Sequence, residues 1–285
     1  MADISASMVK DLRDKTGAGM ADCKKALVDA DGDTNLAIEI LRKKGAASAA
    51  KRADKSANEG MIVANTTNDG KTAAMLEINT ETDFVARNAE FVNYVNTVSA
   101  ALLANDVSTQ QDLYKLSHNG INIENLHNEI LAKFSEKIDA RRMLRWTSNG
   151  FIAAYNHAGN KLAVLIDISA DSLNDESQSL VRDLAMQIAA MNPQFIDRSQ
   201  VDTTTLEKEI EIYKQQAIEQ GKKEEIAEKI AHGRLEKFYS ESCLVEQAFV
   251  KDGSMTVADV LKKISELTGA EAKVLRFMRY ALGES

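Results

Sequence analysis

One structural plan occurs twice in the sequence, and it constrains the fold more than any other feature. Each copy has an apolar segment that opens on glycine, a turn, a second apolar segment and then a helix with a broad apolar face. The apolar segments are 60–65 and 73–79 in the first copy, and 150–155 and 162–168 in the second. Identity between the copies is low, but both open on Gly-apolar-apolar-x-Ala. We interpret this as an internal duplication of a strand-strand-helix unit with antiparallel hairpins.

The rest of the chain is rich in helix-forming sequence. It contains 1 proline, where average usage predicts about 14 in a chain of this length. Residues 1–45 have the pattern of three short helices separated by a glycine-rich break and an Asp-Gly-Asp turn, the third ending before Gly45. A helix over 126–138 and a strand over 141–147 lead into the second copy. The polar stretch 203–239, broken at Gln220-Gly221, is typical of a helical hairpin.

These patterns predict an α+β fold with antiparallel sheets. A three-helix module and a linker precede a duplicated core, the helical hairpin is inserted in the second half of that core, and a strand over 274–280 lies in a C-terminal module. The expected boundaries are 1–45 for the helical module, 46–58 for the linker, 59–140 for the first core unit, 141–202 with 240–272 for the second, 203–239 for the hairpin and 273–285 for the C-terminal module.

Charge and cysteine content narrow the class of protein. The net charge of −8 argues against a general nucleic-acid binder, because such proteins grip a polyanion with a basic surface. No apolar run of about 18 residues and no basic-then-apolar leader is seen, so we expect neither a membrane span nor secretion. Cys23 and Cys243, far apart and outside any C-x-x-C pair, are expected to be buried thiols in a reducing compartment. Together these features predict a cytoplasmic protein.

Common catalytic and metal-binding motifs are missing from the sequence. No phosphate-binding loop, serine elbow or H-E-x-x-H helix occurs, and Gly17-Ala-Gly19 lacks the third glycine of a dinucleotide fingerprint. Glu124 and His127 have an i, i+3 spacing that suits metal ligands, but a second such pair is needed and none follows. We therefore expect no cofactor and no metal. His157 lies at a predicted hairpin tip, where it is either a partner contact or a solvated turn residue.

The stretch Thr82-Asp83-Phe84-Val85 is the most unusual local feature. It forms the short connection between the second strand of the first copy and the following helix. In one interpretation Phe84 packs on that helix as a hydrophobic staple, with Thr82 or Asp83 as the helix cap. In the other, Phe84 projects from the surface as a wedge for a partner. The residues alone leave both open.

Two long motifs and two shorter segments resemble a known family. The motifs are Leu12-Arg-Asp-Lys-Thr-Gly-Ala-Gly-Met-Ala-Asp-Cys-Lys-Lys-Ala-Leu27 and Glu77-Ile-Asn-Thr-Glu-Thr-Asp-Phe-Val-Ala-Arg87. The segments begin at Gly221 and Gly233, in the helical hairpin. All four resemble elongation factor Ts, the family of guanine-nucleotide exchange factors of elongation factor Tu, and the resemblance covers essentially the whole chain. It implies that residues 1–45 are a ubiquitin-associated-like module and that the chain is not an enzyme.

The resemblance also implies roles for individual residues. Asp83 and Phe84, within Thr82–Val85, would enter the nucleotide-binding domain of elongation factor Tu near its magnesium site. Further contacts with this partner, in its GDP-bound and nucleotide-free forms, are implied for Arg13, Met20, Lys24, Phe134, His157 and Val250. No direct contact with nucleic acid or membrane is implied.

Two other classes of function remain as alternatives. One is a small cytosolic hydrolase or transferase that uses His157 with a carboxylate such as Asp167 as an acid–base pair. The other is an adaptor that holds a partner through residues 1–45, which leaves the duplicated core unexplained.

Overall fold

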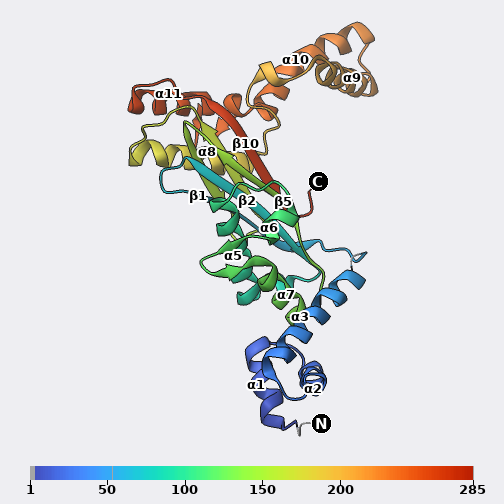
Figure 1. Cartoon of the computed structure of the whole chain (residues 1–285). Coiled ribbons are helices and arrows are strands. Elements are labelled where there is room, and N and C mark those ends of the chain that lie inside the picture. Colours follow the sequence, from blue (N-terminus) through green and yellow to red (C-terminus); the bar gives the residue numbers. More distant parts are fainter. Residues whose placement is uncertain (1–3, 53, 285) are drawn as a thin grey trace.

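The computed structural model describes residues 4–52 and 54–284, and its centre is a pair of antiparallel three-stranded sheets (Figure 1). The first sheet contains β1 (Glu59–Thr66), β2 (Thr72–Thr80) and β5 (Ile138–Thr147) in the order β1-β2-β5. The Asp-Gly turn between β1 and β2 has Gly70 at φ 66°, a backbone region that glycine tolerates best. The mixed helix and antiparallel-sheet composition confirms the predicted α+β class.

The third strand of this sheet corrects a sequence assignment. The segment 126–138 was expected to be helical throughout, but α7 (Ile123–Phe134) ends where Ser135 adopts φ 54°. Ile138 is 4 % exposed and pairs with Thr80 as the first residue of β5. The strand that the sequence pattern placed at 141–147, at the start of the second unit, therefore belongs to the sheet of the first.

The second sheet contains β6 (Phe151–Asn156), β7 (Leu162–Ile168) and β10 (Val274–Ala281) in the order β10-β7-β6. Its hairpin turn has Gly159 and Asn160 at positive φ, as a tight turn requires. Strand β10 accounts for most of the segment 273–285, which the sequence pattern set apart as a C-terminal module. It pairs with β7 along its whole length and so completes the sheet.

The two sheets lie face to face between two layers of helices. Alternate residues of each strand face a helix layer and the other sheet, and Met61 and Ile62 illustrate the two directions. Helices α5 (Ala89–Ala104) and α7 cover the outer face of the first sheet, and α8 (Asp175–Met191) and α11 (Val257–Thr268) cover that of the second. Because both faces of the central strands β2 and β7 are covered, these two strands are buried almost throughout and do not alternate strictly between apolar and polar residues.

The N-terminal helices lie at one end of the molecule. They are α1 (Ala6–Thr16), α2 (Met20–Asp29) and α3 (Thr34–Lys51). Ser5 caps α1, and Gly17 at φ 66° ends it, at the glycine-rich break that the sequence predicts. Helix α3 does not end before Gly45 but continues to Lys51, into the segment 46–58 that was expected to be a helical or flexible linker. A Cβ at Gly45 would lie 2.6 Å from the backbone nitrogen of Ala132 on α7, so this glycine permits close packing of the two helices.

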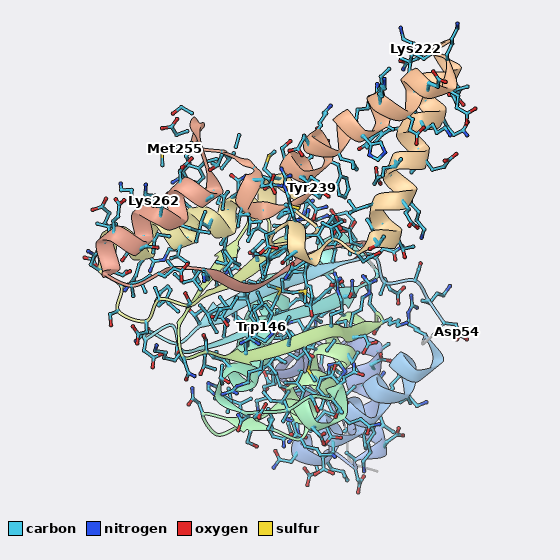
Figure 2. All side chains as sticks on the ribbon, turned by 90° about the horizontal axis from the view of Figure 1, so that it is seen from above. Asp54, Trp146, Lys222, Tyr239, Met255 and Lys262 are labelled. Atoms are coloured by element: carbon cyan, nitrogen blue, oxygen red, sulfur yellow. The ribbon has the colours of Figure 1, made fainter. Side chains whose placement is uncertain are left out.

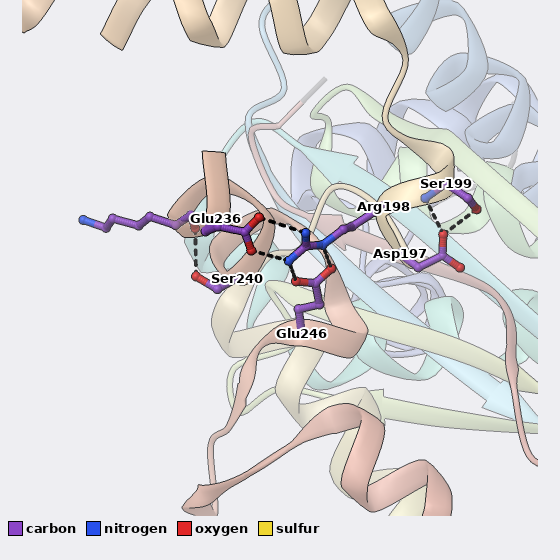
Figure 3. A network of polar contacts seen from close by, with 7 residues as sticks. Asp197, Arg198, Ser199, Glu236, Ser240 and Glu246 are labelled. Atoms are coloured by element: carbon purple, nitrogen blue, oxygen red, sulfur yellow. Dashed lines mark hydrogen bonds and ion pairs between the residues drawn. The ribbon is translucent and has the colours of Figure 1, made fainter. Parts of the chain in front are cut away.

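The predicted helical hairpin projects from the opposite end of the molecule (Figure 1). It consists of α9 (Thr203–Glu219) and α10 (Glu224–Ser242), with Gly221 at φ 79° in the turn between them. Figure 2 shows Lys222 at its far tip and Tyr239 near its base. At the base, Arg198 is paired with Glu236 and Glu246, at 2.7 and 2.5 Å (Figure 3).

The remaining elements are short. They are α4 (Asp83–Ala86), α6 (Gln110–Tyr114), β3 (Ser117–His118), β4 (Ile121–Asn122), η1 (Arg198–Gln200), η2 (Leu244–Glu246), β8 (Ala248–Phe249) and β9 (Asp252–Thr256). Cys23 and Cys243 are both buried free thiols, as expected. Among the described residues, no helix combines the length and the apolar character needed to cross a membrane.

Candidate partner-binding site

The connection between β2 and α5 presents one large apolar side chain to solvent. Residues Asp83–Ala86 form the single helical turn α4, and the Thr82 hydroxyl accepts a hydrogen bond from the Val85 amide at 3.4 Å, as a helix cap does. Val85 is 7 % exposed and packs in the core of the first sheet, whereas Phe84 is 84 % exposed. Phe84 therefore does not pack as a staple, and its ring is the most exposed large apolar side chain described.

A carboxylate lies directly beside this ring. Asp83 is paired with Arg87 one helical turn later, with 3.1 Å between Oδ2 and Nη2. Both side chains are partly exposed, at 39 % and 76 %, so water weakens the attraction between them. The Asp83 carboxylate can therefore exchange Arg87 for groups on a partner at little cost.

Two further carboxylates hold the residues that lead into the turn. Glu136, between α7 and β5, accepts hydrogen bonds from the amide and the hydroxyl of Thr82, at 3.0 and 2.7 Å. Glu81 accepts two hydrogen bonds from Arg52, at 2.7 and 2.5 Å. These bonds lower the pKa of Glu81 to about 2, so its charge is retained at neutral pH. Sequence reasoning missed Glu136, because nothing in its local pattern links it to residues more than fifty positions earlier.

The implied contacts of the N-terminal module are all on its surface. Arg13 on α1 is exposed, and Met20 and Lys24 are exposed on α2, Met20 to 45 %. Val28, 48 % exposed, continues the same face of α2 at helical spacing. Helix α2 thus presents an uncovered stripe with apolar ends and a basic centre.

His157 is exposed at the tip of the second hairpin, as predicted, with Nδ1 2.9 Å from the hydroxyl of Tyr155. Asp167 is 1 % exposed and binds Ser148 and Arg276, at 2.6 and 2.9 Å. Along β7 it lies about 16 Å from Leu162, the residue beside His157, at the usual rise of a strand. The acid–base pair of His157 and Asp167 is therefore not formed.

The last two implied contacts differ in exposure. Phe134 is partly buried at the end of α7 and packs against the core of the first sheet. Val250 is 47 % exposed in the turn between β8 and β9, where its amide donates to Gln187 Oε1 at 2.7 Å. A partner that touched both of these residues, the N-terminal module and His157 would have to extend along the molecule.

The i, i+3 pair of Glu124 and His127 does not form a metal site. Glu124 is exposed, but His127 turns inward, with Nδ1 2.7 Å from the hydroxyl of Tyr94 and its ring stacked on Tyr114 at 4.4 Å. Within the described residues, no group of three or more histidine, cysteine, aspartate or glutamate side chains is placed to hold a metal ion.

Comparison with known proteins identifies the family. The family model described as Elongation factor TS matches residues 81–284. The chain belongs to the elongation factor Ts family. The curated elongation factor Ts of Chloroherpeton thalassium is 47 % identical over 100 % of both chains, and that of Prosthecochloris aestuarii is 44 % identical over 99 % of this chain and 100 % of its own. The elongation factor Ts of Clostridium kluyveri is 42 % identical over 99 % of this chain and 93 % of its own.

Membership of the elongation factor Ts family confirms the resemblance drawn from the sequence motifs. Within the motif Glu77–Arg87, burial divides the residues into two groups. Glu77 and Val85 are buried structural residues, whereas Asp83, Phe84 and Arg87 are accessible to a partner.

Proposed function

We propose that this chain binds elongation factor Tu in its GDP-bound form and accelerates the release of GDP, so that GTP can take its place. The observation that carries the proposal is the exposed Phe84 beside Asp83, on a turn of a chain that belongs to the elongation factor Ts family. Covering an exposed phenyl ring with a partner lowers the free energy of the complex. An exposed Phe84 is therefore suited to insert into a partner as a wedge. The proposed place of action is the cytoplasm.

In the proposed mechanism, Phe84 inserts between side chains of the partner near its magnesium site, and Asp83 lies among the groups that organise the ion. A divalent cation is often the largest local charge at a phosphate site. Displacing it leaves the negative charge of the GDP β-phosphate without its counter-ion, so GDP dissociates faster. No bond is made or broken. By linkage, a factor that weakens nucleotide binding is itself bound more weakly when nucleotide is present, so incoming GTP releases it.

We include six further residues in the proposed interface. Arg13, Met20 and Lys24 would contact the partner from the N-terminal module, and His157 and Val250 from the exposed turns of the core. Phe134, partly buried, would contribute only the accessible part of its ring. The net charge of −8 supports a protein partner rather than direct contact with nucleic acid.

The test of the proposal is the release of fluorescent GDP from elongation factor Tu at substoichiometric amounts of this chain. We expect acceleration by the unmodified chain and a loss of roughly tenfold or more for Phe84→Ala, as for an anchor residue of an interface. The melting temperature should change little, because this ring is not part of the core. No acceleration by the unmodified chain would refute the proposal, and a lowered melting temperature with unchanged exchange would refute the role of Phe84.

Two variants calibrate this result. His157→Ala should lose less than Phe84→Ala, because a contact at the tip of a hairpin is peripheral to the wedge. Leu275→Ala removes another exposed apolar side chain, 51 % accessible on β10 and outside the proposed contacts, and should leave exchange unchanged. A larger loss for His157→Ala than for Phe84→Ala would reverse the proposed ranking.

A further inference from the structure

We propose that Glu136 is a positioning residue that presents Phe84 to the partner; this inference rests on the proposed function. The Glu136 carboxylate accepts four hydrogen bonds from three consecutive residues: the Thr80 hydroxyl at 2.8 Å, the Glu81 amide at 3.1 Å, and the amide and hydroxyl of Thr82 at 3.0 and 2.7 Å. The last of these residues is the cap of the turn that carries Phe84.

The turn needs such support because it is too short to be stable alone. A helix of four residues, Asp83–Ala86, closes too few hydrogen bonds to offset the entropy of ordering its backbone. Val85 is its one fully buried side chain, and Ala86 packs against the same core while only partly buried. A single buried side chain allows the turn to pivot, so a second anchor at its N-terminus is required to fix the direction of the Phe84 ring.

A reciprocal interaction strengthens this second anchor. Glu136 binds the connection that follows β2, and Glu81 of that connection in turn accepts the Lys137 amide, beside Glu136, at 2.7 Å. The other bonds to Glu81 come from Arg52, just beyond the end of α3. The hydrogen bonds of Glu136 and Glu81 therefore join the turn to the start of β5 and to the end of α3, the last helix of the N-terminal module.

An anchor of this kind predicts a specific kinetic signature. Glu136→Ala leaves the other contacts of the interface in place, so it should lower the maximal rate of GDP release roughly tenfold while the half-saturating concentration of elongation factor Tu·GDP changes less than about twofold. Glu136→Gln, which keeps one acceptor oxygen, should be intermediate. Glu124→Ala removes an exposed carboxylate of α7, the helix that precedes Glu136, and should have no effect.

A double-mutant cycle separates positioning from an independent contribution. If Glu136 acts through Phe84, adding Glu136→Ala to Phe84→Ala should cause no further loss of rate. A further loss of about tenfold in the Phe84→Ala background, or full activity of Glu136→Ala alone, would overturn the inference.

A measurement without the partner keeps the two proposals distinguishable. Amide hydrogen exchange of the free chain should be faster at residues 85–87 in Glu136→Ala and unchanged along α5. If the unmodified chain fails to release GDP, the proposed function fails, and this measurement still decides whether Glu136 holds the turn. Unchanged exchange at 85–87 would show that it does not.

Discussion

His127 is partly buried and packs against two tyrosines. Its Nδ1 lies 2.7 Å from the Tyr94 hydroxyl, and the Tyr114 ring stacks on the imidazole. Burial lowers the pKa of His127 to about 4, against the smaller opposing effect of Asp139. Since the partners lie on α5 and α6, the spacing of residues within α7 gave no sign of this environment.

This environment makes the stability of the fold depend on pH. The unfolded chain binds a proton at His127 near its ordinary pKa of about 6.5, whereas the folded chain resists protonation until about pH 4. The contribution of His127 is therefore complete above pH 6.5 and is lost as the pH falls toward 4, by up to about 3 kcal/mol. Urea unfolding of the protein and of His127→Gln should show a flatter pH dependence for the variant between pH 6.5 and 4. Parallel curves would exclude His127 as the cause.

At the scale of elements, the duplicated unit is larger than the strand-strand-helix repeat. Gly60 and Gly150 are separated by as many residues as Glu77 and Asp167, two carboxylates that are 0 % and 1 % exposed. Glu77 is paired with Arg142 on β5 at 2.5 Å, and Asp167 with Arg276 on β10 at 2.9 Å. Each copy thus has a third strand that supplies an arginine to the acid of the second strand.

The two arginines also join the copies. Each donates to a backbone carbonyl of the other sheet and lies over an aromatic ring there. The sets are Arg142 with Ala281 and Tyr280, and Arg276 with Thr147 and Trp146. The equivalence of β5 and β10 could not be predicted from local patterns, because helices separate β5 from its hairpin, and the inserted helical hairpin further separates β10 from its own.

The buried acids should be costly to neutralise. Glu77→Gln removes the counter-charge of Arg141 and Arg142, whose guanidinium groups are partly exposed. Because water solvates these groups in part, we expect a loss of about 1–3 kcal/mol in the free energy of unfolding, and a similar loss for Asp167→Asn. Glu59, whose pair with Lys161 is 34 % and 52 % exposed, is the matched control, and Glu59→Gln should change stability by less than about 0.5 kcal/mol. Denaturant unfolding at pH 7 measures all three. A loss for Glu77→Gln no larger than for Glu59→Gln would mean that the pair adds nothing.

At the scale of the whole molecule, the sequence could predict the features that depend on adjacent residues, but not those that depend on contacts between distant residues. The Ser5 cap, the Asp69-Gly70 turn and the break at Gly221 follow from the preferences of a few adjacent residues, and the structure has each of them. The stacking of the sheets and the bonds of Glu136 depend on residues brought together only by folding. The exposure of Phe84 is of this second kind, since the local pattern suited a staple equally well.

Gly45 is another residue whose role depends on a distant contact. Its close approach to α7 determines how the N-terminal module is attached to the core. A glycine inside a helix is normally destabilising, and replacing it with alanine gains about 1 kcal/mol. Gly233 inside α10 has open space where a Cβ would lie, with no neighbouring atom within 4 Å, so Gly233→Ala should raise the free energy of unfolding. At Gly45 the new methyl group would meet the backbone of Ala132, at 2.6 Å from its nitrogen.

We therefore expect opposite signs for the same substitution at two helical glycines. Gly45→Ala must move α3 away from α7 and should lower the free energy of unfolding by about 1–3 kcal/mol, as overpacking does. Amide hydrogen exchange should be faster in both helices, because their contact is the one that loosens, and unchanged in β6 and β7. Denaturant unfolding of the two variants side by side tests this. If Gly45→Ala were as stabilising as Gly233→Ala, the close approach of α3 and α7 would not be what keeps a glycine at this position.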